Sequence, residues 1–190
     1  MNIVKFLLLL LMLTSCSEKK SEKKERKNSK HEFFSSKYFD ADRVEKDKYN
    51  VKYKGDKLSY SELVLYYSYN KSKKLELLPY SIIMIEKYKQ YDICTDAFDN
   101  LIEFYTEKES LFDGTHKSLI NEYRKIETLD NDQQSFCLYF IKVGAKNNDY
   151  GSMKCLEVLY REGIGVNRDI IIADSIKSKI DSIETYKRRR

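Results

Sequence analysis

The chain has 190 residues, with 35 basic and 30 acidic side chains and a formal net charge of +5. Hydrophobic residues make up 42% of it, which is enough for a folded core and excludes a wholly disordered chain. A single proline, six glycines and four cysteines argue against a turn-rich β-sandwich, a glycine-rich nucleotide fold and a disulfide scaffold. The length predicts one modest domain with appendages.

The first fifteen residues have the features of an export signal. Lys5 supplies a positive charge, and residues 6–13 form an apolar run much shorter than the roughly 20 residues of a membrane-spanning helix. The following Leu13-Thr14-Ser15-Cys16 resembles the lipobox of bacterial lipoproteins. The resemblance implies cleavage before Cys16 and lipid attachment to Cys16, which would hold the chain at the bacterial cell envelope. Ser17 in the next position implies the outer membrane, by the sorting rule of enteric bacteria.

Residues 16–54 are predicted to form the lipidated cysteine and a charged, flexible tether. Residues 18–30 hold seven basic and three acidic side chains and no apolar one, a composition that cannot form a core. Scattered aromatic residues at 32–54 fit either a short N-terminal helix or an irregular arm. Because the basic charge is concentrated near the two ends, residues 31–186 carry a net charge of −4. The domain therefore lacks the basic face of a nucleic-acid-binding protein, and no nucleic-acid partner is predicted.

From Lys57 onward, apolar residues recur at helical spacing. Helices are predicted near 57–70, 79–89, 93–107, 115–127, 132–146, 150–161 and 168–186. A small residue, a leucine and a tyrosine recur at four-residue intervals, which places each set on one helix face. The sets are Ser59-Leu63-Tyr67, Ala97-Leu101-Tyr105 and Ser152-Leu156-Tyr160. Their separation indicates a helical repeat with an insertion at 108–127.

The third set belongs to a longer motif. Its members are Asn148-Asp149, Leu156, Tyr160, Gly163, Gly165-Val166, Asp169 and Ala173. They stand in the order of a Sel1-like repeat, a relative of the tetratricopeptide helix pair. The resemblance implies an all-α fold, a short α-solenoid of about three antiparallel helix pairs over residues 55–187. Glu157 and Ile176 depart from the pattern, and the first two units lack the Gly-x-Gly-Val turn.

No motif for catalysis or metal binding stands out, so the sequence predicts no enzyme, no cofactor and no metal. His31 and His116 lie outside any metal-spaced motif. Cys94, Cys137 and Cys155 lack CxxC spacing and lie among apolar residues at helical spacing. They are predicted to be buried core residues, with a disulfide between two of them as the alternative.

The outward faces of the first helices predict a binding groove, because helix-pair solenoids use a concave face for partners. The outward residues are Leu58, Ser61, Leu65, Ser68 and Tyr69, then Asp96, Asp99, Glu103 and Glu107, then Lys154, Val158, Arg161 and Glu162. The predicted partner-binding residues are Leu58, Leu65, Tyr69, Asp96, Asp99, Glu103, Lys154 and Arg161. An acidic row between an apolar patch and a mixed patch suits a protein partner with a basic centre.

Two functions fit an envelope lipoprotein with such a groove. A lipid-anchored scaffold would organise other envelope proteins, as Sel1-like proteins tend to do, and this is the predicted function. The alternative is an immunity or inhibitor lipoprotein that neutralises a toxin arriving in the envelope. A lipid-anchored enzyme subunit, which would require a catalytic partner chain, is a third reading.

Overall fold

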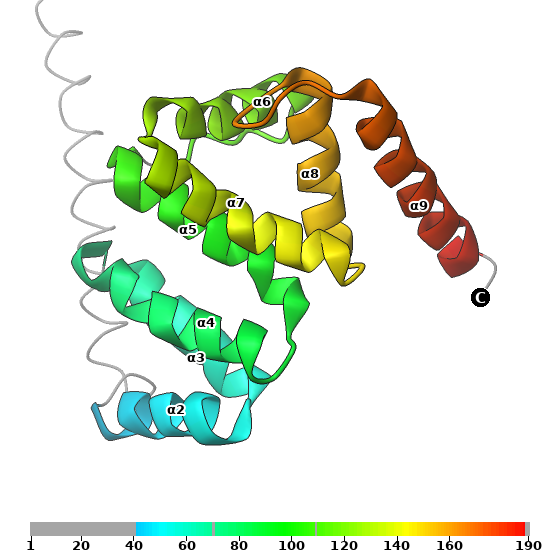
Figure 1. Cartoon of the computed structure of the whole chain (residues 1–190). Helices are drawn as coiled ribbons and strands as arrows, with labels where there is room; N and C mark the ends of the chain where they lie inside the picture. The colour runs from blue at the N-terminus through cyan, green and yellow to red at the C-terminus, as the bar shows by residue number, and fades with distance from the viewer. Residues whose placement is uncertain (1–40, 70, 109, 189–190) are drawn as a thin grey trace, which may run out of the picture.

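A computed structural model of the chain describes residues 41–69, 71–108 and 110–188. In these ranges the regular secondary structure is entirely helical, and short loops connect the helices (Figure 1). The α-helices are α2 Ala41–Lys54, α3 Lys57–Tyr69, α4 Leu78–Glu86, α5 Cys94–Thr106, α6 His116–Arg124, α7 Asn131–Lys146, α8 Tyr150–Glu162 and α9 Ile170–Arg188. Short 3-10 helices are η2 Lys71–Leu77, η3 Tyr91–Ile93 and η4 Lys125–Thr128. Cys16, the export signal and most of the predicted tether lie outside the described residues.

The all-α class predicted from the apolar periodicity is confirmed. Each predicted helix is present, and the ends differ from the expected ones by a few residues at most. Pro79 lies in the first turn of α4, where its missing N–H leaves no helical hydrogen bond unmade. No strand occurs in the three described ranges.

The folded body includes α2, which lies before residue 55, the predicted start of the helical domain. Val44 and Val51, seven residues apart on one face of α2, are buried where this helix contacts α3 and α4. Asn50 Nδ2 donates to Ser59 Oγ at 3.2 Å, which ties α2 to α3. Of the two alternatives for this segment, the helix is correct over residues 41–54. Two buried valines in an otherwise polar stretch are too weak a pattern to settle it from sequence.

Helices α3 and α8 begin in the same way. Gly55 and Asn148 both have a positive φ, at 64° and 62°, and each is followed by an aspartate. Asp56 accepts a hydrogen bond from Ser59 N at 2.7 Å, as Asp149 does from Ser152 N at 2.7 Å. Each aspartate satisfies a backbone N–H that the first helical turn leaves without a partner. The two turns therefore share one chain reversal and one capping interaction.

The turn after α8 has the geometry that its glycines predict. Gly163 ends α8 in the left-handed region, with φ at 70°, and Ile164 N donates to Leu159 O at 3.0 Å. Ile164 is fully buried behind this turn. Asp169 then accepts from Ile172 N at 2.9 Å and caps the start of α9. The Gly163 turn thus reverses the chain so that α9 returns along α8.

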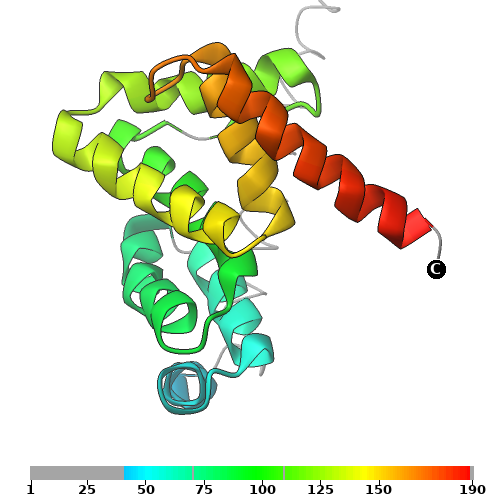
Figure 2. The ribbon, with the colours of Figure 1, turned by 45° about the vertical axis from the view of Figure 1, so that its right-hand side comes forward.

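Helices α5, α7 and α8 contact one another at the centre of the body, with α9 packed on α8. Helices α2, α3 and α4 form the other end (Figure 1). The C-terminal part of α9 extends away from the other helices, as Figure 2 also shows. The small residue and the leucine of each recurring set are buried: Ser59, Leu63, Ala97, Leu101, Ser152 and Leu156. The predicted core faces of α3, α5 and α8 are therefore correct.

Candidate functional site

The predicted groove residues come from three helices, α3, α5 and α8. On α3, Leu58 is 72% exposed and Leu65 is 41% exposed, and Tyr69 is half-buried. On α5, Asp96 and Asp99 reach solvent, and Glu103 is half-buried. These residues face outward as predicted, but their surroundings differ from helix to helix.

On α8, the predicted groove face is occupied by α9. Lys154 Nζ lies 3.4 Å from Glu184 Oε1, and an Arg161 guanidinium nitrogen lies 2.8 Å from Asp174 Oδ1. Val158, predicted to face outward, is buried, because α8 packs against α5, α7 and α9 together. The prediction for Val158 was therefore wrong. Lys154 and Arg161 each pair with an acidic residue of α9, and both remain accessible to solvent.

A pocket of about 230 Å³ lies where α5 faces the inserted segment 108–125, and we call it the α5–α6 pocket. Its acidic residues are Asp99, Glu103 and Glu122, its basic residues are Lys108 and Lys125, and its apolar walls include Phe112, Leu119 and Tyr123. Small-molecule sites commonly have volumes of about 300 Å³ or more. The α5–α6 pocket is closer to the size of one long side chain than to that of a cofactor.

Helix α5 supplies one side of the pocket. Ala97, Phe98 and Leu101 are buried in the core, which turns Asp99 and Glu103 toward the inserted segment. Asp99 and Glu103 are four residues apart and therefore lie one above the other on the helix. Lys74 Nζ, from η2, lies 2.5 Å from Glu103 Oε2, so this carboxylate is already paired.

The inserted segment supplies the facing side of the pocket. Within this segment, hydrogen bonds tie the residues before α6 to α6 itself. Thr115 caps α6 by accepting from Ser118 N at 3.1 Å. Glu122 accepts a hydrogen bond from Leu111 N at 2.9 Å and pairs with Lys125 Nζ at 2.6 Å. These interactions fix the segment before α6 across the mouth of the pocket.

Tyr123 closes the back of the pocket. It is buried, and its ring meets Phe98 of α5 edge-on, with centroids 5.8 Å apart. Burial is the largest cause that raises the pKa of Tyr123, and the neighbouring Cys155 adds to it. The hydroxyl therefore stays protonated at any physiological pH.

Asp99 is the acidic residue of the pocket that lacks a lysine partner among the described residues. Its side chain is exposed to solvent at the pocket, and neighbouring protein atoms replace part of the water around it. This desolvation, followed by repulsion from Asp96 and Glu122, raises the pKa of Asp99 to about 7. Attraction to Lys74 opposes these causes, so the charge of the carboxylate is compensated only in part.

Sequence patterns pointed to Asp99 and Glu103 as outward residues, but not to the rest of this pocket. Glu122, Tyr123, Leu119 and Phe112 all come from the segment that was treated as an insertion between repeats. Leu119 and Tyr123 are four residues apart, so the spacing alone could have marked a helix face. It could not have shown that this face turns toward α5.

The described residues contain no metal-holding group, no membrane-spanning helix and no disulfide. None of their histidines, cysteines and acidic residues gather into a group that could hold a metal ion. Within the same ranges, no helix is long and apolar enough to cross a membrane. Cys94, Cys137 and Cys155 are buried free thiols, so the core role is confirmed and the disulfide is not formed. Burial raises the pKa of Cys94 and of Cys137 to about 12, which keeps both thiols protonated and unreactive.

Comparison with known proteins gave no relative: no family model, curated protein or solved structure matches this chain.

Proposed function

We propose that this chain is a protein-interaction module, held at the bacterial envelope by lipid on Cys16, whose partner inserts a lysine or arginine side chain into the α5–α6 pocket. The observation that carries the proposal is Asp99, a carboxylate in a partly enclosed pocket with no ion-pair partner among the described residues. We propose the scaffold role for this module, with no catalytic activity of its own.

A basic side chain matches this pocket in two ways. Its charged end would compensate the Asp99 carboxylate, which costs free energy when left alone in a desolvated place. Its aliphatic stem would pack against Phe112 and Leu119, since lysine and arginine bury their methylene groups along apolar surfaces. The acidic row predicted a partner with a basic centre. The pocket makes this prediction more specific, because it has room for one inserted lysine or arginine side chain.

We also propose that the helices are about three repeated pairs, α3 with α4, α5 with α7 and α8 with α9, of which the last two pack closely while α3 packs chiefly on α2. The shared openings of α3 and α8, each with a positive-φ residue and a capping aspartate, support this arrangement. Helix α6 and η4 are then the insertion, and they build one wall of the pocket. On this reading, the insertion converts an open repeat surface into a binding pocket.

The test is charge reversal in the pocket. The double variant Asp99→Lys/Glu103→Lys should lose the partner that wild type retains when it is crosslinked in cells and captured. The matched control is Asp42→Lys/Asp132→Lys, which changes two exposed acidic residues outside the pocket by the same charge. The control should capture the partner as wild type does, and circular dichroism should show both variants folded.

Each outcome of this test has one meaning. Equal capture by the pocket variant and the control would contradict the pocket proposal. A partner captured only when a toxin is supplied would replace the scaffold role with the immunity role. Anchoring is tested separately, because Cys16→Ser should move the protein from the detergent phase to the aqueous phase. An unchanged distribution would refute lipid attachment.

A further inference from the structure

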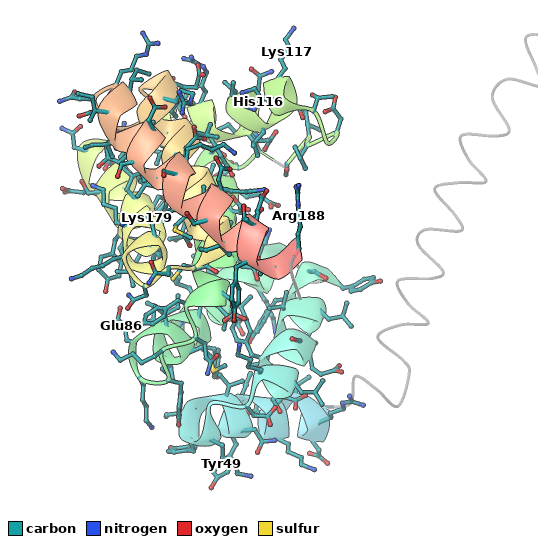
Figure 3. The ribbon with its side chains drawn as sticks, turned by 90° about the vertical axis from the view of Figure 1, so that its right-hand side faces the viewer. Tyr49, Glu86, His116, Lys117, Lys179 and Arg188 are labelled. Carbon is teal, nitrogen blue, oxygen red and sulfur yellow. The ribbon has the colours of Figure 1, made fainter. Side chains whose placement is uncertain are left out.

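A second surface lies at the other end of the molecule, where α2 and α4 end. It contains two tyrosines and four lysines, and we call it the lysine–tyrosine patch: Tyr49, Lys52, Tyr53, Lys54, Lys87 and Lys89. Tyr49 and Tyr53 are 54% and 55% exposed, and their ring centroids lie 4.8 Å apart on the outer face of α2. Tyr49 projects from the lower edge of the molecule in Figure 3.

Contacts between α2 and the turn after α4 hold the patch together. Tyr88 OH donates to Lys52 O at 3.1 Å, and Lys87 Nζ donates to the same oxygen at 3.4 Å. Lys52 Nζ lies 5.3 Å from the Tyr53 ring centroid, and Lys54 Nζ lies 5.6 Å from that of Tyr49. Lys52 and Lys54 therefore lie over the two exposed rings, and Lys87 lies over Tyr88, 4.9 Å from its ring centroid.

The four lysines of the patch have no carboxylate partner among the described residues. Lysines beside the patch do have one: Lys48 pairs with Glu45 at 2.7 Å, and Lys57 pairs with Asp92 at 2.9 Å. Positive charge at a helix C-terminus is favourable, which accounts for Lys52 and Lys54 at the end of α2. That effect gives no reason for two exposed aromatic rings among the lysines.

We propose that the lysine–tyrosine patch lies against a bilayer surface and binds anionic lipid headgroups. Lysine ammonium groups near such a surface are attracted to its negative potential, and tyrosine rings are favoured at the level of the headgroups. Because residues 31–186 carry a net charge of −4, most of the domain would be repelled by the same surface. That asymmetry of charge orients the domain with α2 toward the bilayer.

The position of the patch in the chain agrees with this orientation. Helix α2 is the first described element and begins 25 residues after Cys16. The start of α9 and the α6 residues His116 and Lys117 lie at the opposite end (Figures 1 and 3). This orientation rests on the proposed membrane anchoring, and it leaves the end of the molecule that holds α6 away from the bilayer.

The chain contains no tryptophan, so one introduced tryptophan reports the surroundings of one site. The experiment uses the chain from residue 16 onward with Cys16→Ser, which carries neither the apolar export signal nor acyl chains, and with either Tyr49→Trp or Ile171→Trp. Ile171 is 84% exposed on α9 and serves as the control. The vesicles contain phosphatidylcholine and phosphatidylglycerol with brominated acyl chains. Tyr49→Trp should shift to shorter wavelength and be quenched, and Ile171→Trp should not. Equal responses, or none at Tyr49→Trp, would overturn the proposal.

A second measurement tests the charges. Lys52, Lys54, Lys87 and Lys89 are changed together to Gln, and the matched control changes Lys117, Lys142, Lys146 and Lys179, exposed lysines elsewhere on the body. The patch variant should bind phosphatidylglycerol vesicles at least about tenfold more weakly than the control. Equal binding would overturn the proposal and leave protein contact as the use of the patch. The lysine variants also carry Cys16→Ser. Lipid attachment therefore affects neither the tryptophan emission nor the vesicle binding, and its failure would leave both results unchanged.

Discussion

At the scale of single residues, small side chains determine how closely the central helices approach. A Cβ atom added at Gly144 of α7 would lie 2.1 Å from Ser152 Oγ and 2.9 Å from Cys94 Cβ. Glycine is required there because three helices meet at that point. Ser152 Oγ and Thr95 Oγ1, in the same region, are buried with no hydrogen-bond partner among the described residues. At this junction, the close approach of the helix backbones is retained although two buried hydroxyl groups make no hydrogen bond.

Gly144→Ala should destabilise the fold. Helix propensity favours alanine by about 1 kcal/mol, but the collision with Ser152 and Cys94 forces the helices apart, at a net cost of about 1–3 kcal/mol. Urea denaturation measures the change. Combining Gly144→Ala with Ser152→Gly removes the nearest clash, so the double variant should lose less stability than the two single changes added together. Strict additivity would contradict the contact.

Asp99→Asn should stabilise the protein at high pH and not at low pH. The folded-state pKa is about 7 and the ordinary value is 3.8, so the folded state holds this proton more tightly than the unfolded chain. Wild type therefore loses stability as pH rises from 3.8 to about 7. The asparagine variant lacks that loss.

The gain of Asp99→Asn above pH 7 should be about 1 kcal/mol, a figure reduced because solvent reaches this side chain. Thermal melts at pH 4 and pH 8 measure it, and an identical Tm difference at both pH values would contradict the raised pKa. Binding of a basic partner should strengthen as pH rises through about 7, the folded-state pKa of Asp99, since it requires the ionised carboxylate.

At the scale of single helices, local signals account for where the elements begin and end. Asp56, Asp149 and Asp169 each cap the helix that follows, and Gly163 ends α8 in the left-handed region. Within α3, the face with Leu63 is buried and the face with Leu58 is exposed. Caps, turns and periodicity agree with one another, which is why the predicted helix positions were close to those observed.

Leu63→Ala and Leu58→Ala form a matched pair on α3. Leu63 is 1% exposed, so its truncation should cost about 2–5 kcal/mol of unfolding free energy. Leu58 is 72% exposed, and its truncation should change stability by no more than about 0.5 kcal/mol. Chemical denaturation of the two variants gives the comparison. Similar costs for the pair would mean that the assigned face of α3 is incorrect.

At the scale of the whole molecule, α9 depends on α8 alone for its main contact. Ala173 and Ile180 are its buried residues, and Lys154 and Arg161 of α8 pair with its acidic side chains. The last helix of a repeat array commonly has a polar outer face that protects the helix beneath it. Exposed polar residues such as Ser178 and Asp181 give α9 that character.

A chain that stops at residue 169 should uncover the α8 surface on which Ala173 and Ile180 pack. We expect a lower Tm, binding of a hydrophobic dye, and a loss of helical signal larger than that of the missing residues, because α8 loses a packing partner. The control stops at residue 188 and keeps all of α9. A melting curve unchanged from that of the control would show that α9 contributes nothing to α8.

Much of this molecule followed from the sequence alone. Apolar residues at helical spacing, aspartate caps and glycine turns are local properties, and they determined the helix positions, the core faces of α3, α5 and α8, and the buried cysteines. Helix α2 was not settled, because two valines are a weak periodic signal. Cys16 and the lipobox lie outside the described residues, and lipid attachment stays a prediction.

Tertiary structure decided which of the outward residues are available. Lys154 and Arg161 pair with α9, Val158 is buried, and Asp99 faces a wall built from residues 108–125. The residues that share a helix face can be predicted from sequence, because they recur every three to four residues along the chain. What covers that face depends on side chains distant in sequence, such as Tyr123 across from Asp99, and their approach is fixed by packing of the whole body.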